Sequence, residues 1–178
     1  MNTFLVSDTH FGHVGVTKFL AKDGLTKLRP WDTTEEMDDA MVANWNSVVG
    51  PKDMVYHLGG VAINRKALST LYRLNGRKVL IKGNHDIFSL AEYARHFEDI
   101  RAYGVLDRMI LSHIPVHPDS LGRFGTNIHG HTHDRVVMTE INGTCVPDLR
   151  YICVCVEQTN FTPVPLEFIK KLVKAQGG

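Results

Sequence analysis

The sequence predicts an α/β fold, and three observations support this prediction. An apolar strand, a polar loop and a helical pattern follow one another along the first half of the chain, which is typical of parallel strands with crossover helices. After Phe97 the pattern changes to short strands with little helix between them. The chain has 178 residues, of which 43% are hydrophobic, enough to bury one core. Because no linker, repeat or low-complexity tract interrupts it, we expect one domain over residues 1–178.

In the first half, each expected element ends at a polar or glycine-containing turn. Residues 3–6 form a β-rich run that stops at Ser7 and Asp8. A helix is expected from Thr33 to about residue 49, because Thr33 and Glu36 can form a capping box before apolar residues with helical spacing. The next expected elements are a strand at 54–58, an amphipathic helix at 67–74 and a strand at 79–81.

The sequence of the second half of the chain predicts an antiparallel portion or a second sheet. Strands are expected at 109–112, 126–128, 136–138 and 151–156. Residues 141–144 contain the Asn-Gly pair that is typical of hairpin turns. A last helix is expected from about residue 166 to residue 174.

The composition argues against several classes of protein. There are 20 Lys and Arg against 19 Asp and Glu, so the formal net charge is +1 and no long basic segment is present. A protein held to DNA by charge alone is therefore not expected, and long nucleic acid is not a favoured partner. No apolar run approaches the roughly 18 residues of a membrane span, and the first residues do not resemble a signal peptide. These features predict a soluble, cytoplasmic protein with no membrane partner.

The three cysteines are an odd number, in a chain too large to need disulfides for its stability. Cys153 and Cys155 lie in an alternating apolar run, and Cys145 precedes them. In a chain of this size, free thiols are expected.

The chain contains ten histidines, and many of them follow predicted strands. Because the carboxyl ends of parallel strands meet at one edge of a sheet, groups remote in sequence can converge there. Imidazole nitrogens together with carboxylate and amide oxygens suit Mn, Fe, Zn or Ni, but not a closed structural zinc site. The polar residues found beyond the strands are Asp8, His10, Asn84, His85, Asp86, His113, His131 and His133.

Each of these motifs also has an ordinary explanation. Asp8 alone is typical of a turn or a helix cap, and residues 83–86 could form a simple turn. His113 alone is typical of a core histidine. The pair His131 and His133 is harder to explain in this way, and the whole set in one order favours a metal site.

The ordered motifs resemble those of the calcineurin-like metallophosphoesterases. The resemblance rests on Asp8-x-His10, residues 83–86, His113 and residues 130–133, and it spans residues 3 to about 157. Residues 7–13 and 44–46 are similar to those of the small single-domain phosphoesterases of bacteria and phages. The resemblance implies an α/β fold with a β-sandwich of two sheets flanked by helices, and a centre with two divalent metal ions.

The resemblance also implies roles for individual residues. Asp8, His10 and His133 would hold one metal, and Asn84, His113 and His131 the other. His85 would be the general acid, oriented by Asp86, while a hydroxide bound to the metals attacks phosphorus. The implied substrate is a small phosphodiester or nucleotide.

One position departs from that family's pattern. Gly60 stands where the family has an aspartate that bridges the two metals. Losing this carboxylate should lower metal affinity and rate, so the chain is expected to be an impaired or inactive phosphodiesterase. Gly60 is either a deliberate replacement or a natural loss. The alternative is an interaction module without catalysis that keeps the fold.

The sequence offers six candidates that could contact a phosphate or a base, and leaves the metal, the exact substrate and the oligomeric state open. The candidates are His13, Arg29, Asn46, Arg65, His117 and Arg123.

Overall fold

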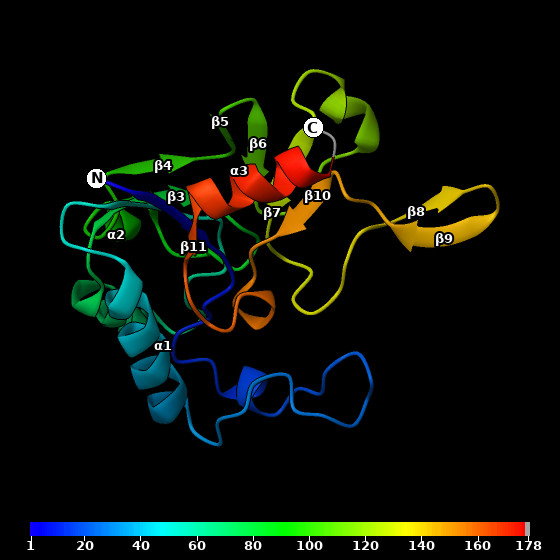
Figure 1. The fold of residues 1–178 in the computed structure, drawn as a ribbon. Helices are drawn as coiled ribbons and strands as arrows, with labels where there is room; N and C mark the ends of the chain where they lie inside the picture. Colours follow the sequence, from blue (N-terminus) through cyan, green and yellow to red (C-terminus); the bar gives the residue numbers. More distant parts are fainter. Residues whose placement is uncertain (177–178) are drawn as a thin grey trace.

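The first sheet carries the start of the chain and is mostly parallel, as the order of strands and helices predicts (Figure 1). The computed structural model describes residues 1–176. In this sheet β1, β2, β3 and β4 run parallel, and β11 pairs antiparallel with β1 at one edge. The strand order is β11 (Val164–Pro165), β1 (Thr3–Val6), β2 (Met54–His57), β3 (Arg77–Ile81) and β4 (Asp99–Arg101).

The second half supplies a second sheet, as predicted, but most of its pairs are parallel. Only β5 and β6 form an antiparallel pair, whereas β7 runs parallel to both of its neighbours. The strand order is β10 (Tyr151–Cys153), β7 (Thr126–His129), β6 (Met109–Ser112) and β5 (Gly104–Leu106).

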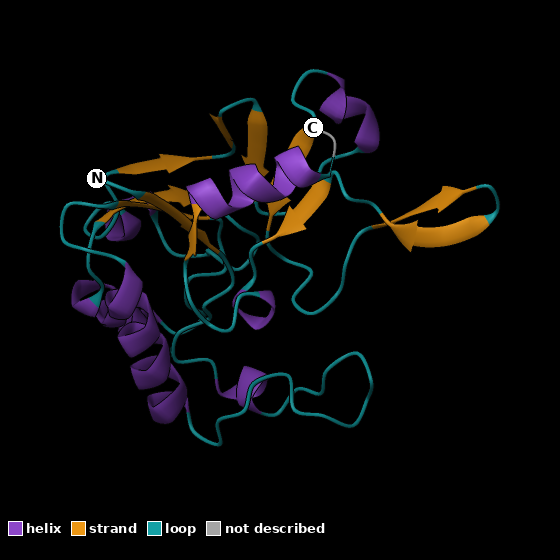
Figure 2. Ribbon diagram, viewed as in Figure 1, coloured by secondary structure: helices purple, strands orange, loops and turns teal. Residues whose placement is uncertain are grey.

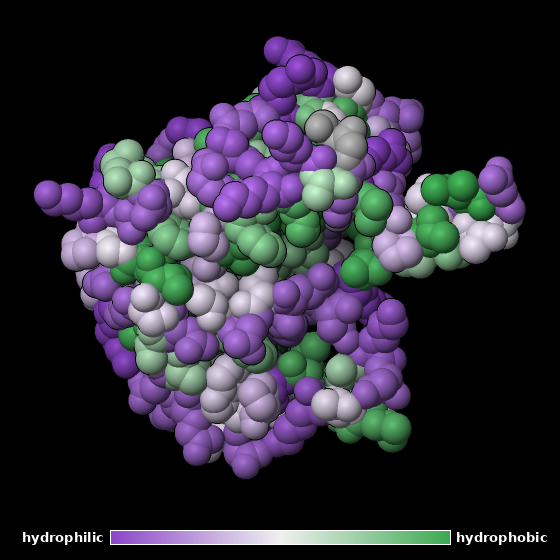
Figure 3. Space-filling view, in the orientation of Figure 1, coloured by the Kyte–Doolittle hydropathy of each residue, from purple (hydrophilic) through white to green (hydrophobic). Residues whose placement is uncertain are grey.

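A separate hairpin of β8 (Met138–Ile141) and β9 (Thr144–Pro147) projects from the rest of the molecule (Figure 2). Asn142 and Gly143 both have positive φ, 51° and 79°, so the predicted hairpin turn is confirmed. The predicted strand at 136–138 begins only at Met138. Met138 and Ile141 are 46% and 57% exposed, and Figure 3 shows apolar side chains on this projection.

The first and last helices agree with the helices predicted from the sequence, whereas the predicted middle helix does not. Helix α1 (Thr34–Val48) begins with the predicted capping box of Thr33 and Glu36. The predicted amphipathic helix at 67–74 is instead the 3₁₀ segment η2 (Arg65–Arg73), which Asn64 caps. The remaining helical segments are η1 (Val14–Thr17), α2 (Leu90–Tyr93), η3 (Pro118–Gly122), η4 (Val156–Gln158) and α3 (Leu166–Ala175).

Two hydrophobic clusters hold these elements together. The first joins α1 and η2 to the first sheet and includes Trp45 and Leu71. The second contains Leu5 and Ile81 of the first sheet together with Leu111 of the second. The α/β class is therefore confirmed. The described residues form three sheets, and the expected sandwich of two sheets is not confirmed. Among residues 1–176, no helix has the length and apolarity needed to cross a membrane.

The loops that leave the carboxyl ends of both sheets contact one another. Asp8 N–H, after β1, donates to Gly59 O, after β2, at 2.9 Å. Gly130 N–H, after β7, donates to His113 O, after β6, at 2.9 Å. Ser7 N–H donates to Val154 O at 2.9 Å, which connects the two sheets. The predicted convergence of strand ends is thus present in the fold.

Candidate metal centre

Asp8 lies at the middle of the converging loops. Its side chain is buried, and Oδ1 lies 3.3 Å from His10 Nε2. Its Oδ2 accepts hydrogen bonds from Ser7 Oγ at 2.6 Å, from His131 N–H at 2.7 Å and from Cys155 Sγ at 3.2 Å. Burial would raise the pKa of Asp8, but the hydrogen bond with His10 and the charges of His10 and His113 hold it well below its usual value. The group is therefore an ionised carboxylate at neutral pH.

Asp8, His10 and His133 form one possible set of metal ligands. One ligand atom from each lies within 4.8 Å of the other two. The His10 and His133 rings stack with centroids 5.4 Å apart. His10 Nδ1 is buried without a hydrogen-bond partner. One carboxylate and two imidazoles are a donor set that first-row transition metals bind, so these residues fit a divalent cation.

His113, Asn84 and His131 form a second group next to the first. His113 Nδ1 lies 2.7 Å from Leu58 O, so this nitrogen carries a proton in the neutral ring. His113 Nε2 then faces Asn84 Oδ1, another acceptor, at only 2.6 Å. A cation bound by both atoms would satisfy both of them. The His131 ring lies 5.2 Å from that of His113, which places a further imidazole beside the pair.

Four residues of the centre have left-handed backbones. The φ angles are 57° for Asp8, 47° for His10, 69° for His131 and 52° for His133. Such a conformation destabilises a residue other than glycine by roughly 1–2 kcal/mol. Backbone strain of this kind is common at functional sites. The fold therefore holds these four side chains at a cost in stability.

Glu157 is a contact of this centre that the sequence analysis missed. It lies in η4 with a buried side chain, and its Oε1 is 3.0 Å from His133 Nδ1. Burial would lower the pKa of His133, but the hydrogen bond and the charge of Glu157 raise it above its usual value. A carboxylate that orients a ligating imidazole in this way is common in metal sites.

Arg29 is buried behind the centre, so the substrate contact predicted for it is wrong. Its side chain is 0% exposed. Nε and Nη2 donate to Glu157 Oε1, Nη2 also donates to Asp8 O at 2.6 Å, and Nη1 donates to Thr9 O at 2.7 Å and to Met37 Sδ. All five N–H groups are therefore used inside the protein. Arg29 holds the backbone of the Asp8 loop in place.

Asp86 also has a different role from the predicted one. Its buried carboxylate accepts hydrogen bonds from the backbone N–H groups of Gly60 at 3.0 Å, Val61 at 2.9 Å and Gly83 at 2.7 Å. These contacts join the loops after β2 and β3, and none of them orients His85. The His85 side chain is exposed, and its ring lies 5.4 Å from that of His10.

Gly60 faces the carboxylate of Asp8. Its φ is +68°, and a Cβ at this position would lie 2.5 Å from Asp8 Oδ1. A side chain at residue 60 would therefore point at the metal ligands and require Asp8 to move. Gly130 is equally restricted, because a Cβ there would lie 1.9 Å from Ser7 Oγ.

Of the other predicted substrate contacts, His13 lies at the centre, with its ring 5.8 Å from that of His10. The other four have contacts elsewhere. Asn46 bonds the backbone of Arg73 and Asn75, Arg65 contacts Glu92 and Phe88, His117 pairs with Asp119, and Arg123 lies over the Phe124 ring. The three cysteines are free, as expected.

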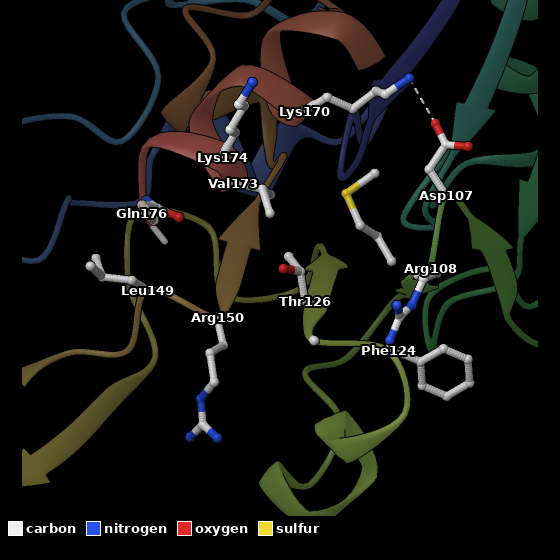
Figure 4. A pocket seen from close by; sticks show the side chains of 12 residues that line it. Asp107, Arg108, Phe124, Thr126, Leu149, Arg150, Lys170, Val173, Lys174 and Gln176 are labelled. Carbon is white, nitrogen blue, oxygen red and sulfur yellow. Dashed lines mark ion pairs between the residues drawn. The ribbon is translucent and has the colours of Figure 1, made fainter. Parts of the chain in front are cut away.

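A large cavity of the described residues is remote from these groups. It has a volume of about 700 Å³ and lies where α3 faces the starts of β6, β7 and β10 (Figure 4). Arg108, Arg150, Lys170 and Lys174 surround an apolar floor. It contains none of the residues that the sequence analysis singled out, and Lys170 and Arg150 are paired with carboxylates.

The chain matches one relative over nearly its whole length. The uncharacterized protein MJ1445 of Methanocaldococcus jannaschii is 36% identical over 177 residues, which cover 96% of this chain and 90% of that protein. This chain belongs to the MJ1445 family. The gene 66 protein of Mycobacterium phage L5 is 36% identical over 91 residues, covering 48% of this chain and 40% of that protein.

A solved structure supports the fold of the MJ1445 family. The protein of unknown function AQ665 from Aquifex aeolicus superimposes with a TM-score of 0.63 at 24% identity, over 96% of this chain and 98% of that one. This likeness concerns the fold alone.

The expected membership of the calcineurin-like metallophosphoesterases is corrected by these comparisons. No family model matches the chain, and the relative that shows its family is uncharacterized. The phosphopantetheinyl hydrolase of Mycobacterium tuberculosis superimposes with a TM-score of only 0.44 at 12% identity, which is too low to support an inference. The short motifs were not sufficient to identify the family, because the same chemistry recurs on unrelated folds.

Proposed function

We propose that this member of the MJ1445 family is a metal-dependent hydrolase that acts on small phosphate esters. The observation that carries the proposal is the meeting of Asp8, His10 and His133, with ligand atoms within 4.8 Å of one another. A second group, of two imidazoles and an amide oxygen, touches it through Asp8, whose Oδ2 accepts the His131 N–H. Paired sites of this kind suit phosphoryl chemistry, where charge develops on several oxygens at once.

The residues divide into two sets of ligands. Asp8, His10 and His133 would hold one divalent cation, and Asn84, His113 and His131 a second. Bound cations of this type lower the pKa of water and neutralise phosphoryl oxygens. The mixture of imidazole and oxygen donors favours Mn, Fe, Zn or Ni.

The exposed imidazole of His85 is suited to give a proton to the departing group. Its ring is next to His10 and reaches solvent, so it can contact a substrate held over the centre. General acid catalysis of this type contributes roughly 10²- to 10⁴-fold. Asp86 supports this step only by fixing the loop that carries His85.

Gly60 makes the centre poorer in negative charge than a paired metal site needs. Only Asp8 supplies a carboxylate among the six proposed ligands, so two cations would be poorly neutralised. We therefore expect weak binding of the second cation and slow turnover.

The test is metal binding and hydrolysis by the full chain. Mn²⁺ titration by calorimetry should give at least one bound ion per chain, and bis(p-nitrophenyl) phosphate should be hydrolysed only when Mn²⁺ is present. Asp8→Asn and His133→Ala should abolish both, whereas His117→Ala, which is exposed and away from the centre, should change neither. A folded protein that binds no ion would contradict the proposal and favour an interaction module.

A further inference from the structure

A cleft opens directly beside the proposed ligands His131 and His133. It has a volume of about 430 Å³, which is in the range of small-molecule sites. The loop 131–135 forms one wall, and Phe19, Leu20 and Leu28 form the opposite wall. A molecule in this cleft would therefore contact both the metal ligands and an apolar surface.

The apolar wall is fixed to the centre. Leu28 N–H donates to Phe19 O at 2.8 Å, so the segment folds back on itself as a narrow loop. Lys22 N–H donates to Asp134 Oδ2 at 2.5 Å, which bonds the tip of this loop to the loop that carries the ligands. The Phe19 ring meets the His13 ring edge-on at 5.9 Å. The two walls of the cleft are thus connected at more than one point.

Apolar side chains remain uncovered on this wall. Phe19 is 50% exposed and Leu20 is 54% exposed, although both lie next to a strongly polar centre. Exposed apolar groups that gather at a cleft mark a binding surface better than the same groups scattered singly. An aromatic ring and two leucines offer a flat contact to another ring.

A positive charge lies on the other wall. Arg135 is exposed, and within residues 1–176 its guanidinium has no carboxylate within 4.0 Å. Its backbone is held, because Arg135 N–H donates to Thr132 O at 2.9 Å and Gln158 Nε2 donates to Arg135 O at 3.0 Å. A cationic side chain on this wall favours a ligand that carries negative charge.

We propose that this cleft binds the aromatic part of the substrate, an aryl or nucleobase ring esterified to the phosphate. Phe19 and Leu20 would be specificity-determining residues that contact the ring, while the phosphate lies at the ligands and near Arg135. This inference rests on the proposed function and names the substrate class of the same site.

The test measures binding, without requiring turnover. Phenylphosphonate and methylphosphonate share the phosphonate group but differ in the ring, and calorimetry on the Mn²⁺-loaded chain can compare them at a pH where both are fully ionised. We expect the phenyl compound to bind about tenfold more tightly, and Phe19→Ala and Leu20→Ser to remove most of this preference without changing methylphosphonate binding. The matched control is Phe168→Ala, because Phe168 is 57% exposed on α3 and outside the cleft.

The outcomes separate the two proposals. If both phosphonates bind equally, or if Phe19→Ala and Leu20→Ser leave the preference intact, the aromatic subsite is wrong while the phosphate site stands. If the Mn²⁺-loaded chain binds neither compound, the phosphate site itself is wrong and both proposals fail. Because Phe19 and Leu20 are half-exposed, unchanged circular dichroism is expected and would show that each variant is folded.

Discussion

Oε1 of Glu157 lies 3.0 Å from Nδ1 of His133, so Nε2 of the same ring is left to face the candidate metal centre. Glu157 therefore fixes the tautomer and the orientation of His133 from behind. The same oxygen also accepts from Arg29, which donates in turn to the backbone of Asp8. One buried carboxylate thus supports both the carboxylate ligand and one of the imidazole ligands.

The first prediction concerns Glu157→Gln. The amide oxygen can still accept a hydrogen bond, but the negative charge that strengthens His133 as a ligand is lost. Affinity for Mn²⁺ should fall about 10- to 100-fold in calorimetric titration, as is usual for such supporting residues. Glu167→Gln, at an exposed residue of α3, should leave the affinity unchanged. Equal affinities in the wild type and in a folded Glu157→Gln variant would show that Glu157 only stabilises the fold.

The second prediction concerns the buried ion pair itself. Arg29→Met leaves the buried Glu157 carboxylate with His133 but without its arginine partner, and it removes the donors that bind the carbonyls of Asp8 and Thr9. The free energy of unfolding should fall by about 3–5 kcal/mol in urea titration. Arg73→Met removes an exposed ion pair with Asp39 and should cost no more than about 1 kcal/mol. Similar losses in the two variants would show that Arg29 does not hold the Asp8 loop in place.

The third prediction concerns Gly60. A carboxylate placed there would lie beside Asp8 and supply the negative charge that the centre lacks, although the Cβ would force Asp8 to shift. Gly60→Asp should raise Mn²⁺ affinity by tenfold or more, and turnover of bis(p-nitrophenyl) phosphate with it, at a cost of roughly 1–2 kcal/mol in stability from the left-handed backbone.

Gly60→Asn is the matched control for this change, because it has the same shape and strain without the charge. If Gly60→Asp and Gly60→Asn behave alike in metal titration, charge at residue 60 does not limit the centre. If Gly60→Asp binds two ions and still turns over no phosphate ester, the interaction module becomes the better explanation.

The sequence predicted which strand ends would converge, because the ligand types follow buried strands of a parallel sheet. Asp8, His10 and His133 were found in this way, and the structure brings them together. Glu157 was missed because it follows an expected strand without a distinctive motif, and its contact with His133 depends on how two loops pack. Arg29 was wrongly predicted to contact the substrate for a related reason. Nothing in the sequence around an arginine in a loop indicates that its side chain is buried.

Local patterns were also insufficient for the middle of the chain. Apolar spacing predicted an α-helix at 67–74, yet these residues form part of a 3₁₀ segment. Apolar residues three apart satisfy both kinds of helix, so periodicity alone does not separate them. The role of Asp86 could not be predicted from local sequence either. Its carboxylate accepts from the backbone N–H groups of Gly60 and Val61, which are remote in sequence.

The last prediction concerns pH and His57. This histidine at the end of β2 is completely buried, and its Nε2 lies 3.0 Å from Thr9 Oγ1. Because Thr9 Oγ1 donates to Val61 O, it accepts from His57, which fits a neutral ring. Burial lowers the pKa of His57 from 6.5 to about 4, against the raising effect of Asp86 and Asp8.

As the pH falls, the unfolded chain therefore binds a proton at residue 57 at a higher pH than the folded chain does. The stability due to neutral His57 is fully present above pH 6.5 and is lost as the pH falls towards 4. Relative to His57→Gln, the wild type should lose up to about 3 kcal/mol between pH 7 and pH 4 in urea titration with a chelator present. His117→Gln, at an exposed histidine, should follow the wild type. Parallel losses in the wild type and His57→Gln would mean that His57 does not resist protonation, and that other groups cause the acid sensitivity.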